Sequence, residues 1–298
     1  MLFASIDIGS NAVRLFFANV FELKGNPIAE KASLIRIPLR LGLDVFESGC
    51  ISQKKIDSLI KTMHAFRMLM EVYKPLDYVA VATSAMREAS NNSMIIEQII
   101  KETGINVRII DGIEEAEILC ATDNLDTGKK FSLTMYTDVG GGSTEISVLK
   151  NHVLLDSASF KLGTICIMND KVHEEEWLRL GEWLHKYKPD FGRIYLVGSG
   201  GNINKLSKLY STQPDNSISL PNLKSGFKKL SKMTLQQRIE EMGMRPDRAD
   251  VIIPAAEIFM SIMKTTQSSY IFVPRIGLSD GLIYTVYKKY KANLAPVN

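Results

Sequence analysis

The sequence has few of the residues that metal centres and histidine-dependent active sites need. Its three cysteines, Cys50, Cys120 and Cys166, are odd in number and lie far apart, which fits neither a disulfide framework nor a zinc site. The four histidines do not cluster, so a histidine metal site and a serine–histidine triad are not predicted. Because unpaired thiols are typical of a reducing compartment, we expect a cytoplasmic protein.

A strong net charge and a long apolar run are also lacking. The formal net charge of the 298 residues is +3, which does not indicate a nucleic-acid partner. The apolar N-terminus is interrupted by Asp7, Asn11 and Arg14 and has no basic leader, so we expect neither a signal peptide nor a membrane span. With 45% hydrophobic and 23% charged residues, the composition is that of a globular protein long enough for two domains.

The sequence does contain one unusually glycine-rich stretch, at residues 138–145. It reads Asp-Val-Gly-Gly-Gly-Ser-Thr-Glu and lies between two strand-like apolar runs, 133–137 and 146–149. Glycine inside such a hairpin is unfavourable by about 1 kcal/mol relative to alanine. A plain flexible turn needs only one or two glycines and no flanking acids. We therefore interpret the stretch as a loop whose backbone N–H groups approach an anion closely.

A second stretch, Asp7-Ile-Gly-Ser-Asn11, repeats the chemistry of the first between two further apolar strands. This weak internal repeat predicts two related halves, with two anion-binding loops facing each other across a cleft. The polar stretch 122–130 is typical of a domain junction. We therefore expect an N-terminal domain at 1–122, with the C-terminal helix 282–298 packing back on it, and a second domain at 123–281.

Three other segments are candidates for function or for connection. The segment Thr83–Arg87 follows a short buried strand and suits an oxyanion, although a helix cap with a surface arginine explains it equally well. The stretch Asp111–Glu114 fits a capping box, which leaves Glu115 as a candidate general base or as a solvated acid. Residues 39–44 are expected to form a loop with one basic residue.

The motifs together identify a family. The chain resembles the exopolyphosphatase and guanosine pentaphosphate phosphatase family, and the resemblance covers nearly all 298 residues in its short form, without the C-terminal extension of longer members. The motifs that carry it, in order, are Asp7–Asn11 with Arg14, Thr83–Arg87, Gly112-x-Glu-Glu-Ala116, Asp138–Glu145, Gly198–Gly201 and Arg248-Ala-Asp-x-x-x-Pro254.

The resemblance implies both a fold and a reaction. The fold is α/β, with two actin-like (ribonuclease H-like) domains whose mixed five-stranded sheets lie around an inter-domain cleft. The implied reaction is Mg²⁺-assisted hydrolysis of a terminal phosphoanhydride, with polyphosphate as substrate, or alternatively the guanosine alarmone pppGpp. By the same resemblance Glu115 activates the attacking water with help from Glu145, and Asp138 and Asp7 hold the metal. The implied phosphate-binding residues are Ser10, Asn11, Arg87, Gly141, Gly142 and Ser143.

Some positions depart from the family pattern. Ala12 stands where the family often has serine, and Ser199 and Asn202 replace commoner glycine and threonine, which affects substrate choice more than the hydrolytic centre. Two alternatives of another class are a non-catalytic sensor of polyphosphate or alarmone and a kinase of the same superfold. Glu115 and Glu145 argue against the sensor. A homodimer is expected by analogy alone, and no nucleic acid or membrane partner is expected.

Overall fold

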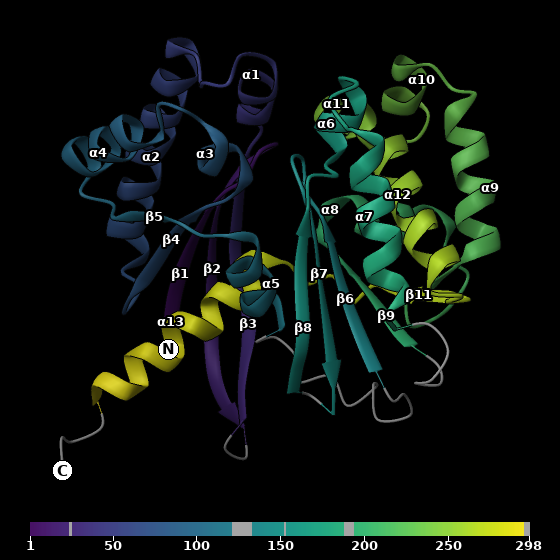
Figure 1. The fold of residues 1–298 in the computed structure, drawn as a ribbon. Helices are drawn as coiled ribbons and strands as arrows, with labels where there is room; N and C mark the ends of the chain where they lie inside the picture. The colour runs from purple at the N-terminus through teal and green to yellow at the C-terminus, as the bar shows by residue number, and fades with distance from the viewer. Residues whose placement is uncertain (24–25, 121–132, 152, 188–193, 295–298) are drawn as a thin grey trace. The chain divides into compact units, whose positions relative to one another are not determined.

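The chain divides into two units, each with its own sheet and core. The computed structural model describes residues 1–23, 26–120, 133–151, 153–187 and 194–294 (Figure 1). Unit 1 comprises residues 1–122 and 278–298, and unit 2 comprises residues 123–277. The polar stretch 122–130, interpreted above as a junction, lies outside the described residues.

Unit 1 is built on a mixed sheet with the strand order β3-β2-β1-β4-β5. The first three strands form an antiparallel meander, whereas β4 and β5 run parallel to β1. Residues 3–8 of β1 are all buried, because helices cover both faces of the sheet. The strands are β1 (Leu2–Ile8), β2 (Val13–Leu23), β3 (Asn26–Ile37), β4 (Tyr78–Ala82) and β5 (Val107–Ile109).

The helices of unit 1 cover the two faces of this sheet. Helices α2 and α4 supply the main core, whereas α13 lies across β1 and β2 on the other side, where the Phe3 ring meets Tyr287 and Tyr290 edge-on (Figure 1). They are α1 (Leu41–Ser48), α2 (Gln53–Tyr73), α3 (Ser84–Glu88), α4 (Asn92–Thr103), α5 (Gly112–Cys120) and α13 (Leu278–Leu294).

The expectation of a loop at residues 39–44 was correct for residues 39–40 and wrong for residues 41–44, which are helical. Helix α1 begins at Leu41, directly after Arg40, whose backbone adopts the left-handed conformation with φ 55°. Leu41 and Val45 are one helical turn apart and both are buried, so burial of this apolar pair stabilises the helix. The helix is short, contains one glycine and is followed directly by another, which is why the sequence did not indicate it.

Unit 2 repeats the strand order of unit 1 and adds one strand. Its sheet has the order β10-β11-β9-β6-β7-β8, with β6, β7 and β8 as the antiparallel meander. The described residues therefore form a six-stranded sheet where five strands were expected, because β10 contains only two residues and has no readable periodicity. The strands are β6 (Leu133–Val139), β7 (Thr144–Lys150), β8 (Val153–Phe160), β9 (Ile194–Ser199), β10 (Ile218–Ser219) and β11 (Tyr270–Phe272).

The core of unit 2 forms around α12, which is buried along most of its length and contacts α6, α7, α8 and α9. Helix α10 begins with a capping box, in which the side chains of Thr234 and Gln237 each accept a backbone N–H of the other residue. None of the described helices has the length and apolarity needed to cross a membrane. The helices are α6 (Thr164–Met168), α7 (Glu174–His185), α8 (Gly200–Tyr210), α9 (Leu220–Ser231), α10 (Leu235–Glu240), α11 (Pro246–Ala249) and α12 (Ile252–Thr265).

The first hairpin turn of each unit is closed in the same way. In unit 1 the Gly9 amide donates to the Ala12 carbonyl at 3.1 Å, and in unit 2 the Gly140 amide donates to the Ser143 carbonyl at 2.9 Å. Each turn connects the central strand of its sheet to the next strand of the meander. The predicted internal repeat is therefore confirmed in strand order and in turn geometry.

Candidate functional site

In unit 1, the predicted residues gather where β1 ends. Asp7 is 2% exposed and lies opposite Arg14 in the antiparallel register, and the two side chains form an ion pair. Ser10 is buried and Asn11 is half-buried in the turn that follows. The amides of Arg40 and Gly42 donate to the carbonyls of Asn11 and Ser10 at 3.1 and 2.9 Å. The backbone at the start of α1 therefore holds the turn through the carbonyl groups of the turn.

The adjacent parallel strands bring Arg87 and Glu115 to the same edge of this sheet. The carboxyl end of β4 pairs with that of β1, and the Thr83 amide donates to the Ile8 carbonyl at 3.1 Å. Arg87 then donates to the Ile110 carbonyl at 2.9 Å, just before α5. This contact places the guanidinium beside the segment that leads to Glu115. Because a guanidinium has five N–H donors, the contact uses only some of them.

The start of α5 follows the sequence prediction in one half only. The Asp111 carboxylate accepts the Glu114 amide at 2.8 Å, as an N-cap does. The Glu114 carboxylate was expected to return a hydrogen bond to the Asp111 backbone, but instead it pairs with Arg108 at 2.5 Å. Glu115 lies half-buried in the first turn, where the helix dipole stabilises a negative charge.

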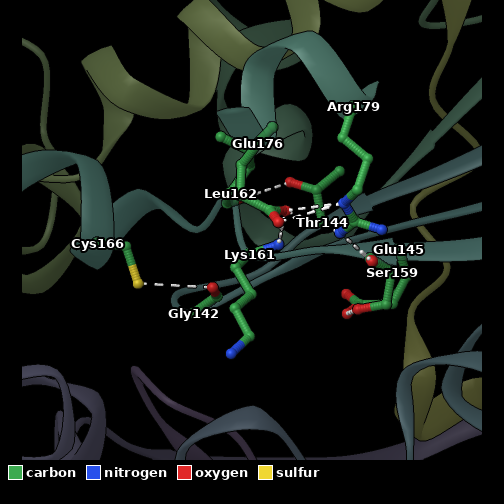
Figure 2. A network of polar contacts seen from close by, with 9 residues as sticks. All are labelled: Gly142, Thr144, Glu145, Ser159, Lys161, Leu162, Cys166, Glu176 and Arg179. Atoms are coloured by element: carbon green, nitrogen blue, oxygen red, sulfur yellow. Dashed lines mark hydrogen bonds and ion pairs between the residues drawn. The ribbon is translucent and has the colours of Figure 1, made fainter. Parts of the chain in front are cut away.

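In unit 2, the glycine turn rests on the start of α6. The Thr164 amide donates to the Gly140 carbonyl at 3.0 Å and the Ile165 amide to the Gly141 carbonyl at 2.8 Å. The Cys166 thiol donates to the Gly142 carbonyl at 3.5 Å (Figure 2). Three consecutive residues thus hold three consecutive carbonyls of the glycine run. These hydrogen bonds fix the backbone conformation of the turn through its carbonyl groups.

The contact between this turn and α6 requires a glycine at position 163. A Cβ atom at Gly163 would lie 2.2 Å from the Gly141 carbonyl oxygen and 2.2 Å from the Gly142 carbonyl carbon. Both are backbone atoms, so no side-chain rotation can relieve the overlap. Gly163 is not among the site residues that the sequence predicts. A glycine in a short turn between a strand and a helix was the available signal.

Two acidic side chains of unit 2 lie at directly paired positions. Asp138 on β6 and Glu145 on β7 are opposite each other in the antiparallel register and therefore share one face of the sheet. Glu145 is 3% exposed and accepts a hydrogen bond from the Ser159 hydroxyl at 2.9 Å. Paired carboxylates repel each other, so a cation between them would be stabilising. The same two positions in unit 1 carry Asp7 and Arg14, an oppositely charged pair.

The second glycine-rich segment, residues 198–202, is the direct junction of β9 and α8 and packs on these groups. Gly200 has φ +86°, and a Cβ atom there would lie 2.4 Å from the Asp138 Oδ1 atom. A Cβ atom at Gly201 would lie 2.3 Å from the Nη1 atom of Arg248. The junction therefore lies against an acid of the glycine-rich stretch and an arginine of the Arg-Ala-Asp motif.

The predicted site residues thus form two groups, one on each unit. Unit 1 brings together Asp7, Ser10, Asn11, Arg87 and Glu115 at the carboxyl ends of β1, β4 and β5, and unit 2 brings together Asp138, Gly141, Gly142, Ser143 and Glu145. Ser143 is buried at the end of its turn. Sequence reasoning missed Ser159, because nothing in a serine near the end of a strand indicates that it contacts an acid on the neighbouring strand.

Known proteins are similar to this chain over most of its length. The model of the Ppx/GppA phosphatase family matches residues 32–290. A bifunctional 3-dehydroquinate synthase/phosphatase of Fusobacterium nucleatum is 26% identical over 91% of the chain, which spans only 44% of that relative. Exopolyphosphatase 1 of Mycobacterium leprae is 23% identical over 93% of the chain and 87% of the relative. A guanosine-5'-triphosphate,3'-diphosphate pyrophosphatase of Aliivibrio fischeri is 23% identical, covering 95% of the chain and 59% of the relative.

Among solved structures, an exopolyphosphatase from Cytophaga hutchinsonii superposes with a TM-score of 0.84. It is 22% identical, and the match covers 97% of this chain and 98% of that one. At that identity the likeness concerns the fold. It confirms the predicted fold class of two α/β domains with mixed sheets.

Proposed function

Because the chain belongs to the Ppx/GppA phosphatase family, we propose that it is an exopolyphosphatase, which hydrolyses the terminal phosphoanhydride bond of inorganic polyphosphate and releases orthophosphate. The observation that carries this proposal is the pair of equivalently closed hairpin turns, at Gly9–Ala12 and Gly140–Ser143, each beside an acid. Turns that expose successive backbone N–H groups suit phosphate oxygens, and phosphoryl transfer depends mainly on positioning and charge neutralisation.

In this proposal the residues of the two groups divide the work. Ser10, Asn11, Gly141, Gly142 and Ser143 bind phosphate oxygens, and Arg87 offsets their charge. Glu115 accepts a proton from the attacking water, which forms a bond to the terminal phosphorus as the bridging oxygen leaves with the rest of the chain. The start of α5 favours the ionised form of Glu115, which a base requires.

A divalent cation fits the acidic pair of unit 2. Mg²⁺ usually binds one or two carboxylates and completes its shell with water and substrate phosphates. Among the described residues no cluster of three histidine, cysteine, aspartate or glutamate side chains could hold a metal alone, whereas Asp138 and Glu145 share one sheet face. We expect Asp138 to hold the ion. Asp7 fits less well, because Arg14 already neutralises it. When bound, Mg²⁺ supplies charge neutralisation for the phosphates.

Gly200→Ala tests the support of Asp138. The added Cβ would overlap Asp138 Oδ1, and alanine is strained at φ +86°, so the carboxylate must move. We expect the Mg²⁺ concentration for half-maximal phosphate release to rise about tenfold. Gly49→Ala is a matched control, because Gly49 also has positive φ (+78°) but no atom within 4 Å. Equal Mg²⁺ requirements in both variants would contradict the assigned role.

The alternative substrate is pppGpp, in which the bond to be hydrolysed is also a terminal phosphoanhydride. The similarity to the Aliivibrio fischeri pyrophosphatase supports pppGpp as a second candidate. The cytoplasmic location also stays a proposal, supported by the thiols of Cys50 and Cys166, neither of which forms a disulfide in the described part of the chain. The homodimer expected by analogy is untested and stays a prediction.

Phosphate release by the purified full chain with Mg²⁺ separates these substrates. We expect polyphosphates of several lengths to be cleaved with a higher kcat/KM than pppGpp, ATP and GTP. A preference for pppGpp would transfer the assignment to the alternative. Failure to release phosphate from any of them, combined with tight binding of polyphosphate, would favour the sensor.

A further inference from the structure

We propose that Ser159 and Arg179 are positioning residues that hold the Glu145 carboxylate, Ser159 directly and Arg179 through the end of β8. The proposal rests on the proposed function and on the role that the family resemblance implies for Glu145, which is to help Glu115 activate the attacking water. It assigns a role to the polar network of Ser159, Arg179 and Glu176 around the end of β8 (Figure 2). The proposed reaction does not use these three residues directly.

Ser159 contacts Glu145 directly. The two residues face each other in the register of β7 and β8, and the Ser159 hydroxyl donates to Glu145 Oε1 at 2.9 Å. Because Glu145 is only 3% exposed, water has little access with which to replace this donor. A buried carboxylate that loses such a donor is oriented less tightly.

Arg179 on α7 fixes the strand segment that carries Ser159. Its Nη2 atom donates to the Ser159 carbonyl at 2.7 Å, and its guanidinium carbon lies 4.5 Å from the centre of the Phe160 ring. Its partner Glu176, at 2.7 Å, accepts the Lys161 amide at 2.9 Å. One ion pair on α7 therefore contacts three consecutive residues of the chain, 159–161. Figure 2 shows its contacts with Ser159 and Lys161.

The place of β8 in the sheet explains why it needs this support. β8 is the edge strand of the unit 2 sheet, so among the described strands β7 alone pairs with it. Its end would otherwise have no hydrogen-bond partners on the outer side. Although burial raises the pKa of Glu176, hydrogen bonds from Arg179 and from the Lys161 amide lower it below its usual range, so the pair stays charged at neutral pH.

The ion pair of Arg179 with Glu176 is too exposed to contribute much to the stability of the fold. The Arg179 side chain is 47% exposed, and ion pairs at such sites contribute little to the stability of the fold. A positioning role instead predicts an effect on turnover that is large relative to the effect on folding.

We expect Ser159→Ala to lower kcat for phosphate release about tenfold and Arg179→Ala roughly threefold, with KM changed less than about twofold in both. Arg179→Lys should recover part of the loss, because lysine can still donate to the Ser159 carbonyl. Two controls match these variants. Arg67 is equally exposed at 47% and pairs with Glu71 on α2. Ser147 on β7 is buried, and its hydroxyl has no hydrogen-bond partner among the described residues. Arg67→Ala and Ser147→Ala should keep the wild-type kcat.

A double-mutant cycle separates positioning from a general structural effect. If both residues act through Glu145, Ser159→Ala and Arg179→Ala should lower kcat by less than the product of their separate effects, and neither should lower it further in a Glu145→Gln background. Multiplicative effects, or losses matched by Arg67→Ala and Ser147→Ala, would overturn the proposal.

A readout independent of activity tells failure of this proposal from failure of the proposed function. Amide hydrogen exchange at Lys161 should speed up in Arg179→Ala and stay unchanged in Arg67→Ala, at equal thermal midpoints. Unchanged exchange would overturn the role of Arg179 whatever the substrate. Faster exchange with no phosphate release from the wild-type chain would overturn the proposed function and leave the contact in place.

Discussion

Replacement of Glu115 by glutamine is expected to lower kcat for phosphate release by roughly 10²–10⁴-fold, the contribution typical of a positioned general base. Glutamine keeps the size and most hydrogen bonds of glutamate but cannot accept the proton of the attacking water. Glu115 is half-buried in the first turn of α5, whereas the neighbouring Glu114 forms an ion pair with Arg108. Substrate binding should change little, because the base acts on water and not on the phosphate chain.

Glu117→Gln on the same helix is the matched control for this prediction. Glu117 is exposed and two residues further along α5, so its replacement changes the net charge by the same amount without touching the site. Single-turnover phosphate release should be unaffected by Glu117→Gln. If Glu115→Gln kept more than about a third of the wild-type rate, the base would have to be another acid, and Glu145 would be tested next.

Much of the architecture was predictable because it depends on periodicity. Alternating apolar residues located the central strands of both units, and the two apolar runs predicted around the glycine-rich stretch, 133–137 and 146–149, lie within β6 and β7. The acids at the ends of β1 and β6 were predictable for the same reason, since they directly follow apolar runs. Glu115 emerged by elimination, after Asp111 and Glu114 had been given structural tasks.

Contacts between residues distant in the sequence were not predictable. The pairing of Glu145 with Ser159 depends on the register of β7 and β8 across an intervening turn, which no local pattern encodes. The ion pair of Asp7 with Arg14 likewise depends on strand register and reduces the case for Asp7 as a metal ligand. The tight packing of Gly163 on the glycine turn joins residues about twenty positions apart and becomes visible only in three dimensions.

That packing leads to the second large effect, because Gly163→Ala should disable the glycine turn. The added methyl group would overlap backbone atoms of Gly141 and Gly142, so the turn and α6 must separate. Separation would break the hydrogen bonds from Thr164 and Ile165 to the glycine carbonyls. We expect a loss of about 1–3 kcal/mol in the free energy of unfolding, and a fall in kcat/KM of roughly a hundredfold.

Gly181→Ala provides the matched comparison. Gly181 lies inside α7, and a methyl group added there would meet no atom within 4 Å, so alanine should stabilise the protein by about 0.5–1 kcal/mol through helix propensity alone. Urea unfolding and phosphate release should be measured on both variants. If Gly163→Ala matched Gly181→Ala in stability and activity, the glycine turn would not depend on its contact with α6. If Gly163→Ala were less stable but fully active, α6 would support the fold of unit 2 without shaping the phosphate site.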